Sequence, residues 1–156
     1  MEIQLLVLGK TNESVIQQLC DLYIQKIKHY SKFSFEVIDN HQIKSEDSDR
    51  IKEEEAKLTF KKIKDTDWLI LLDENGKEFN SIQFSDQLQK WMNSGVKKVV
   101  FLVGGAFGFH QHIYDRANGK ISLSKMTFSH QLIRPIFLEQ LYRAFTILKN
   151  EPYHHR

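Results

Sequence analysis

The chain has 156 residues, 41% of them hydrophobic and 27% charged, which is enough to bury the core of one ordinary domain. No apolar run reaches the roughly 18 residues that a membrane span needs, and the N-terminus has no signal-peptide pattern, so we expect a cytoplasmic protein without a membrane partner. Twenty-two Lys and Arg against 20 Asp and Glu give a net charge of +2, which disfavours a protein that grips DNA or RNA alone through its phosphates.

The N-terminal half predicts alternating strands and helices. Residues 3–8 form a short apolar run that ends at Gly9, as a strand would. Asn12 is a plausible N-cap for a helix to about Tyr30, and the single Cys20 within it excludes an internal disulfide and is expected to be buried. Alternating residues at 33–38 predict a second strand. A charged helix is expected over 45–64, with its charges on a solvated face.

The C-terminal half continues this alternation. Residues 68–72 predict a buried strand closed by Asp73, with a turn at 74–77. Asn80 and Gln83 resemble a capping box for a helix to Ser94, which Gly95 would end. A strand at 99–103 runs into a glycine-rich segment at 104–108. A short helix around 110–117, a brief strand at 120–124 and a long helix over 133–149 complete the chain.

Helices between strands that are apolar on both faces predict a single α/β domain, residues 1–156, with a largely parallel sheet. Ligands of such sheets collect beyond the carboxyl ends of the strands, here in the loops after Leu72, Val103 and Ser124. Gly104, Gly105 and Gly108 would let the backbone approach a ligand closely, although they are equally typical of a tight strand-to-helix turn. The segment is neither a Walker loop nor a G-x-G-x-x-G fingerprint.

Two other kinds of chemistry lack support. The histidines at 110, 112, 154 and 155 do not show the i, i+4 pairing of a helix-borne zinc site, so we expect no metal. No Gly-x-Ser-x-Gly elbow exists for a serine hydrolase.

The last helix is apolar over about two-thirds of its circumference, at ~100° per residue. A helix that packs on a single core needs a narrower stripe. We therefore expect a second buried contact, most simply in a homodimer, through outward residues such as Phe137 and Leu141. The alternative is that another element of the same chain covers this surface.

The hydrophilic tail after this helix is by default an ordinary terminus. Its Tyr153, His154 and Arg156, however, together offer a hydrogen-bond donor, a proton acceptor and a phosphate-pairing fork.

Three segments resemble one known family. These are Leu-Leu-Asp-Glu-Asn-Gly-Lys at 71–77, Phe-Leu-Val-Gly-Gly-Ala-Phe-Gly at 101–108, and Ile-Ser-Leu-Ser-Lys-Met-Thr-Phe-Ser-His-Gln-Leu-Ile-Arg at 121–134, followed by Glu-Gln-Leu-Tyr-Arg-Ala-Phe at 139–145 and Pro-Tyr-His at 152–154. Their order and spacing resemble the ribosomal RNA large subunit methyltransferase H family, small members of the SPOUT class of RNA methyltransferases. Residues 10–65 resemble it mainly in pattern. Two departures are Ser129, where the family often has proline, and the additional His155.

The resemblance implies a deep trefoil knot, a homodimer and S-adenosylmethionine as cofactor. It implies that the substrate is a pseudouridine in helix 69 of 23S rRNA, methylated at N3 within an assembled ribosome. Such a composite target would suit the modest net charge. The family's cofactor contacts carry over onto Leu72, Gly104, Leu123, Ser124, Lys125, Met126, Thr127 and Phe128.

The N3 atom of pseudouridine carries a proton that must leave during methylation. We expect His154 to accept it, Tyr153 to orient the base, and Arg143 or Arg156 to hold a phosphate or the developing charge. Three alternatives remain: a SPOUT enzyme acting on another RNA such as tRNA, an RNA- or ribosome-binding module without turnover, and, more distantly, a flavodoxin-like nucleotide protein.

Overall fold

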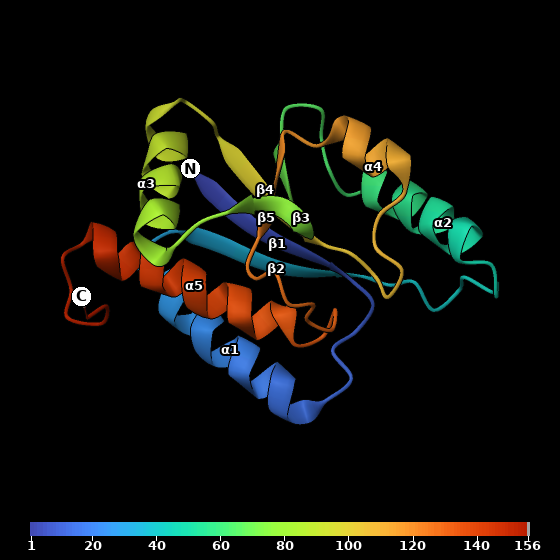
Figure 1. Ribbon diagram of the computed structural model, residues 1–156, viewed down its shortest axis with the longest axis horizontal. Coiled ribbons are helices and arrows are strands. Elements are labelled where there is room, and N and C mark those ends of the chain that lie inside the picture. The colour runs from blue at the N-terminus through green and yellow to red at the C-terminus, as the bar shows by residue number, and fades with distance from the viewer. Residues whose placement is uncertain (156) are drawn as a thin grey trace.

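The computed structural model describes residues 1–155, and its centre is a five-stranded sheet (Figure 1). Ten elements follow one another along the chain: β1 (Glu2–Leu8), α1 (Ser14–Lys28), β2 (Lys32–Ile38), α2 (Ser48–Phe60), β3 (Trp68–Glu78), α3 (Ser81–Asn93), β4 (Lys98–Val103), α4 (Gln111–Arg116), β5 (Gly119–Ser122) and α5 (Ile133–Leu148).

All strand pairs of the sheet are parallel, in the order β2-β1-β4-β3-β5. Leu5 of β1, for example, lies opposite Phe35 on one side and Phe101 on the other. The predicted α/β class is confirmed. Because the strands are parallel, their carboxyl ends meet at one edge of the sheet, where the loops after β3, β4 and β5 gather.

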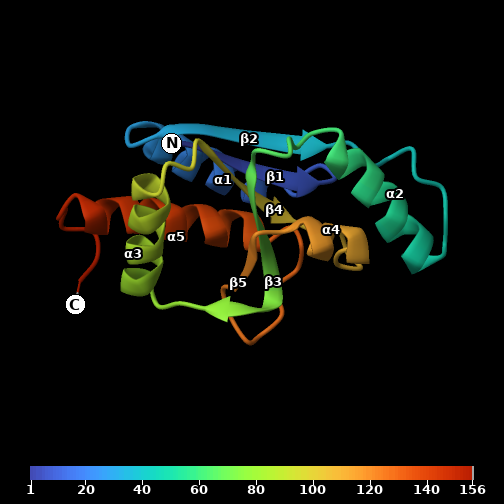
Figure 2. The same cartoon turned by 90° about the horizontal axis from the view of Figure 1, so that it is seen from above.

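Helices cover both faces of the sheet (Figure 2). On β1, Ile3, Leu5 and Val7 belong to the core beneath α1, α3 and α5, whereas Leu6 and Leu8 pack with α2 and α4. Both sets of side chains are therefore buried, which explains the continuous apolar runs. Cys20 is fully buried in the first of these cores, as predicted. None of the helices in residues 1–155 is long and apolar enough to cross a membrane.

The prediction that Phe137 and Leu141 point outward from the last helix is wrong. Both side chains are 0% exposed, because α5 lies against the sheet and is flanked by α1 on one side and α3 on the other (Figure 1). The sheet, α1 and α3 of the same chain therefore cover the wide apolar surface of α5. The exposed apolar face belongs instead to α1, where Val15, Leu19 and Leu22 are 73%, 41% and 49% exposed.

The predicted turn at 74–77 is also wrong, because β3 continues to Glu78 through an irregularity. Leu72 and Lys77 both lie opposite Ile121 of β5, so the segment between them bulges out of the ladder. Gly76 allows this: a Cβ there would lie 2.5 Å from the carbonyl carbon of Ile121. The bulge carries Asp73, Glu74 and Asn75 over the edge of the sheet.

The capping prediction is confirmed for α3 but is wrong for α1. The Asn80–Gln83 capping box is present on α3, and Gly95 after this helix has a φ of +81°. Asn12 is not the N-cap of α1; Glu13 occupies that position without a side-chain bond, and the Asn12 backbone N–H donates to the Gln131 side chain instead. The start of α1 is therefore held by a contact with the loop before α5, and its N-cap residue makes no side-chain bond.

Candidate functional site

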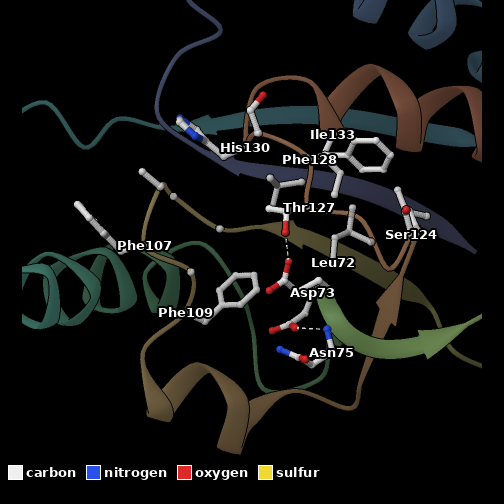
Figure 3. Close-up of a pocket in the computed structure, with 18 of the residues that line it drawn as sticks. Leu72, Asp73, Asn75, Phe107, Phe109, Ser124, Thr127, Phe128, His130 and Ile133 are labelled. Atoms are coloured by element: carbon white, nitrogen blue, oxygen red, sulfur yellow. Dashed lines mark hydrogen bonds between the residues drawn. The ribbon is translucent and has the colours of Figure 1, made fainter.

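A cavity of about 520 Å³ opens at the carboxyl ends of β3 and β4 and beside the segment that follows β5 (Figure 3). Its walls come from three segments far apart in sequence, within 72–75, 103–109 and 123–133, together with Tyr114 of α4. Seven of the eight residues assigned to the cofactor by resemblance line it, namely Leu72, Gly104, Leu123, Ser124, Met126, Thr127 and Phe128. Lys125 does not; its exposed ammonium lies 3.9 Å from a Glu78 carboxylate oxygen.

Hydrogen bonds between these segments fix the shape of the cavity. The Thr127 hydroxyl donates to Glu74 at 2.6 Å, which links the segment after β5 to the bulge in β3 (Figure 3). Asp73 accepts the Asn75 backbone N–H at 2.7 Å and the Tyr114 hydroxyl at 2.5 Å. Burial raises the pKa of Tyr114, and its bond to Asp73 raises it further, so this phenol stays protonated as a donor. Asp73 and Glu74 belong to the first segment of family resemblance, but neither was predicted as a cofactor contact, and Tyr114 was given no role.

The glycine segment turns tightly beside the cavity. A Cβ on Gly104 would meet the Phe109 ring at 3.1 and 3.3 Å, and one on Gly105 would lie 2.7 and 2.8 Å from the two Glu55 oxygens. Gly108 has a φ of +81°, in the left-handed region that favours glycine. Gly105 and Gly108 therefore serve the turn itself, whereas Gly104 lies against the side chain of Phe109, which lines the cavity.

A fully buried arginine anchors the segment after β5. Arg134 donates to the Leu8 carbonyl and the Thr11 hydroxyl at 2.9 Å and to the His130 carbonyl at 3.0 Å. No carboxylate in residues 1–155 forms an ion pair with it, and burial lowers its pKa. Arg134 thus ties the cavity wall to the end of β1. Arg134 ends the third segment of family resemblance, but the sequence analysis gave it no role.

We expect Arg134→Met to lower the free energy of unfolding by about 2–4 kcal/mol, because each buried carbonyl left without a donor costs about 1–3 kcal/mol. Urea unfolding measures this change. Lys44→Met, at an exposed position, is the matched control and should change stability by less than about 0.5 kcal/mol. Equal stability of the two variants would contradict the anchoring role.

The predicted catalytic residues do come together, in a second cluster at the end of α5. The Arg143 guanidinium forms an ion pair with Glu139 at 2.5 Å and lies 3.4 Å from the His154 Nδ1 atom. The Tyr153 hydroxyl donates to Glu139 at 3.0 Å, and Arg143 lies over the Tyr153 ring. Burial, followed by bonds to Tyr23 and Glu139, raises the pKa of Tyr153, which makes it a hydrogen-bond donor rather than a base. Glu139 was not predicted.

This cluster is not at the cavity of its own chain. Ile133 lines the cavity, and Arg143 follows ten residues later, about 15 Å along the helix axis at the usual rise per residue. The tail at 150–155 leaves from the opposite end of α5 (Figure 1). His155 is exposed, and Arg156 lies outside the described residues. One chain therefore presents two separate groups of predicted residues.

Comparison with known proteins places this geometry in a family. The model of the family described as "Predicted SPOUT methyltransferase" matches residues 1–154. Proteins named ribosomal RNA large subunit methyltransferase H are similar over the full length of both chains, with 54% identity in Flavobacterium psychrophilum and 50% in Christiangramia forsetii. The protein of this name from Porphyromonas gingivalis is 44% identical over 99% of each chain. The chain therefore belongs to the SPOUT methyltransferase family, as the three sequence segments predicted.

Proposed function

We propose that this chain is an S-adenosylmethionine-dependent methyltransferase of 23S rRNA, which methylates N3 of a pseudouridine in helix 69 of the assembled bacterial ribosome. The observation that carries the proposal is the cavity at the sheet edge, built from the three segments of family resemblance. The relatives are named for methylation of large-subunit ribosomal RNA. Such an enzyme works in the cytoplasm, where ribosomes are.

The residues of the cavity fit the cofactor. Its volume is within the usual range for small-molecule pockets, and Leu72, Phe109, Phe128 and Ile133 provide apolar walls for a purine. The Asp73 and Glu74 carboxylates lie on one side, where a sulfonium would find negative charge. When bound, S-adenosylmethionine supplies the methyl group. We infer that the segments around it form the trefoil knot that the family resemblance implies.

The tail supplies the remaining chemistry in this proposal. His154 accepts the N3 proton, Tyr153 orients the base as a protonated donor, and Arg143 stabilises phosphate or the developing negative charge. Arg143 is already paired with Glu139, so that carboxylate sets the orientation of both Arg143 and Tyr153.

The tail cluster lies ~15 Å along α5 from the cavity of its own chain. The simplest arrangement is therefore that it acts on the cavity of a second copy. We infer a homodimer through the α1 face formed by Val15, Leu19 and Leu22, called the α1 patch below. The helices α1 and α5 run in the same direction, since Asn12 contacts Gln131 at one end and Tyr30 contacts Glu151 at the other. A two-fold axis that crosses these helices at a right angle makes the helices of the two copies antiparallel. The tail of one copy then lies beside the cavity of its partner.

A methyl-transfer assay on ribosomes, free 23S rRNA and tRNA tests the substrate. We expect methyl incorporation with ribosomes, and mass spectrometry of the rRNA should find the added methyl on N3 of one pseudouridine. Transfer to tRNA alone would instead identify another SPOUT enzyme. Calorimetry with S-adenosylmethionine separates an enzyme from a binding module, which need not bind the cofactor.

Gly104→Val should abolish cofactor binding while the chain remains folded. The added side chain would push against the Phe109 ring, which itself lines the cavity. Calorimetry measures the affinity, and circular dichroism checks the fold. Affinity equal to that of the wild type would remove the glycine segment from the cofactor site.

A further inference from the structure

The glycine segment between β4 and α4 contains a closed turn with an aromatic residue at its tip. The Gly108 backbone N–H donates to the Gly105 carbonyl at 3.2 Å, and the two glycines form an isolated antiparallel bridge. Ala106 and Phe107 therefore occupy the two central positions of a four-residue turn. Such positions usually carry glycine, proline or a short polar residue, whereas Phe107 is 55% exposed there. Its ring belongs to neither core of the sheet.

The base of this turn is fixed by packing against α2. The Glu55 carboxyl group, only 4% exposed, lies against Gly105, where a Cβ would be 2.7 Å from Oε1. The Asn40 side-chain amide donates to Oε1 at 2.9 Å, while Oε2 has no hydrogen-bond partner in residues 1–155 and is covered by the glycine segment. Because the turn is fixed in this way, the Phe107 ring loses little conformational freedom when it contacts a ligand.

Phe107 stands at the rim of three adjoining cavities. It lines the cavity of about 520 Å³ assigned to the cofactor, a second of about 260 Å³ beside α2 that includes Lys10, and a third of about 490 Å³ between α2 and α4. Leu72, 6% exposed, belongs to the floor of the cofactor cavity, and Phe107 points away from it (Figure 3). The ring therefore lies beside the place of the cofactor and is accessible from solvent.

A positive charge on this rim suits an RNA backbone. Lys10 is exposed and forms no ion pair within residues 1–155. The Gln131 side-chain amide donates to the Lys10 carbonyl at 3.0 Å, which holds this part of the chain beside the segment that follows β5. Lys52, in the third cavity, is instead paired with Asp49 at 3.1 Å. Lys10 can therefore contact a phosphate next to the Phe107 ring.

Removal of a base from an RNA stack leaves its neighbour uncovered. Enzymes that act on a base take it out of the stack, and this costs the adjacent base one of its stacking partners. In proteins that bind single-stranded RNA, aromatic side chains supply the missing flat surface, and they do so for any base. A ring at the rim of the reacting cavity is in the place where the uncovered neighbour would lie.

We propose that the turn carrying Phe107 is a docking surface for a single-stranded segment of the RNA substrate, in which the base next to the target pseudouridine stacks on the Phe107 ring. Lys10 contacts a backbone phosphate of the same segment. This inference rests on the proposed function and adds the surface that holds the RNA outside the reacting cavity. The helices α2 and α4 cover the face of the sheet opposite α1, so a homodimer through the α1 patch leaves this surface open.

Single-turnover methyl transfer, measured against ribosome concentration, tests this proposal. Phe107→Ala should raise the ribosome concentration for half-maximal rate by about 5–150-fold, the usual effect of removing one aromatic stacking partner. The rate at saturating ribosome and the affinity for S-adenosylmethionine should stay near the wild-type values. Phe107→Tyr keeps the flat ring and should bind ribosomes as the wild type does. Phe107→Leu keeps an apolar side chain without the ring and should lose most of the affinity, which a purely structural role would not require.

Phe60→Ala is the matched control, because Phe60 is also an exposed phenylalanine, at 39%, but ends α2 and lines none of the three cavities. It should bind ribosomes with wild-type affinity. Lys10→Met should weaken binding mainly at low salt, since a phosphate contact is screened, whereas the loss in Phe107→Ala should persist at high salt.

Wild-type ribosome affinity in Phe107→Leu would overturn the proposal. A loss confined to the saturating rate would also overturn it, because the ring would then contact the target base itself, and a loss confined to cofactor affinity would assign the ring to S-adenosylmethionine. In each of these cases an active wild type leaves the proposed function standing. Wild-type protein that is inactive on ribosomes would refute the proposed function and this surface together.

Discussion

His154→Ala should reduce methyl transfer by about 10²–10⁴-fold, the usual cost of a lost proton acceptor, while cofactor affinity stays at the wild-type value. Single-turnover rates at saturating ribosome, measured against pH, test this. A role in phosphate binding would produce a different pattern, with weaker RNA binding and a smaller salt dependence. The assignment fails if the rate loss vanishes when the ribosome concentration is raised. His155→Ala, at an exposed neighbouring position, should remain nearly as active as the wild type.

Co-expression of Gly104→Val and His154→Ala chains should restore activity that neither variant has alone. If the tail acts on the cavity of the partner, each mixed dimer contains one site with both an intact cavity and an intact tail. Random pairing of the two chains then gives about a quarter of the wild-type activity per chain. If the tail acted within its own chain, every site in the mixture would carry one defect. An inactive mixture that contains mixed dimers would therefore contradict the proposed arrangement.

Replacing Leu19 and Leu22 together by Glu should yield folded, inactive monomers. Both side chains lie on the exposed α1 patch, so the charges would be solvated in one chain but buried in a dimer. Sedimentation measures the mass, and circular dichroism checks the fold. Leu141→Glu is the contrasting variant: because Leu141 is fully buried within one chain, it should unfold the protein rather than separate two copies. Wild-type protein that sediments as a monomer at micromolar concentration would exclude this dimer.

Local signals predicted most of the elements correctly. The apolar runs of β1 and β4 and the Asn80–Gln83 capping box depend on residues close in sequence, and the structure contains all three. The same signals failed at two places. Glu13 rather than Asn12 is the N-cap of α1, and β3 extends beyond Asp73 because β5 pairs with it.

The family resemblance located most of the cavity lining but gave no sign of the buried carboxylate of Glu55. Its segments at 72, 104 and 123–128 converge on the cavity, as expected, with Lys125 as the exception. Glu55 escaped notice because it lies in a charged run of α2 that was interpreted as a solvated face. Only the packing of α2 against the glycine segment buries that single carboxylate among its exposed neighbours.

The sequence by itself determined the α/β class, the order of the elements and the family, because hydrophobic periodicity, capping residues and motif spacing are properties of neighbouring residues. The tertiary structure alone decided which apolar faces remain exposed, which carboxylate is buried without a full set of partners, and that the tail lies far from its own cavity. These are consequences of contacts between segments distant in sequence. Whether a side chain is buried, and which cavity it lies near, depends on the segments that pack against it. No local sequence pattern specifies those segments.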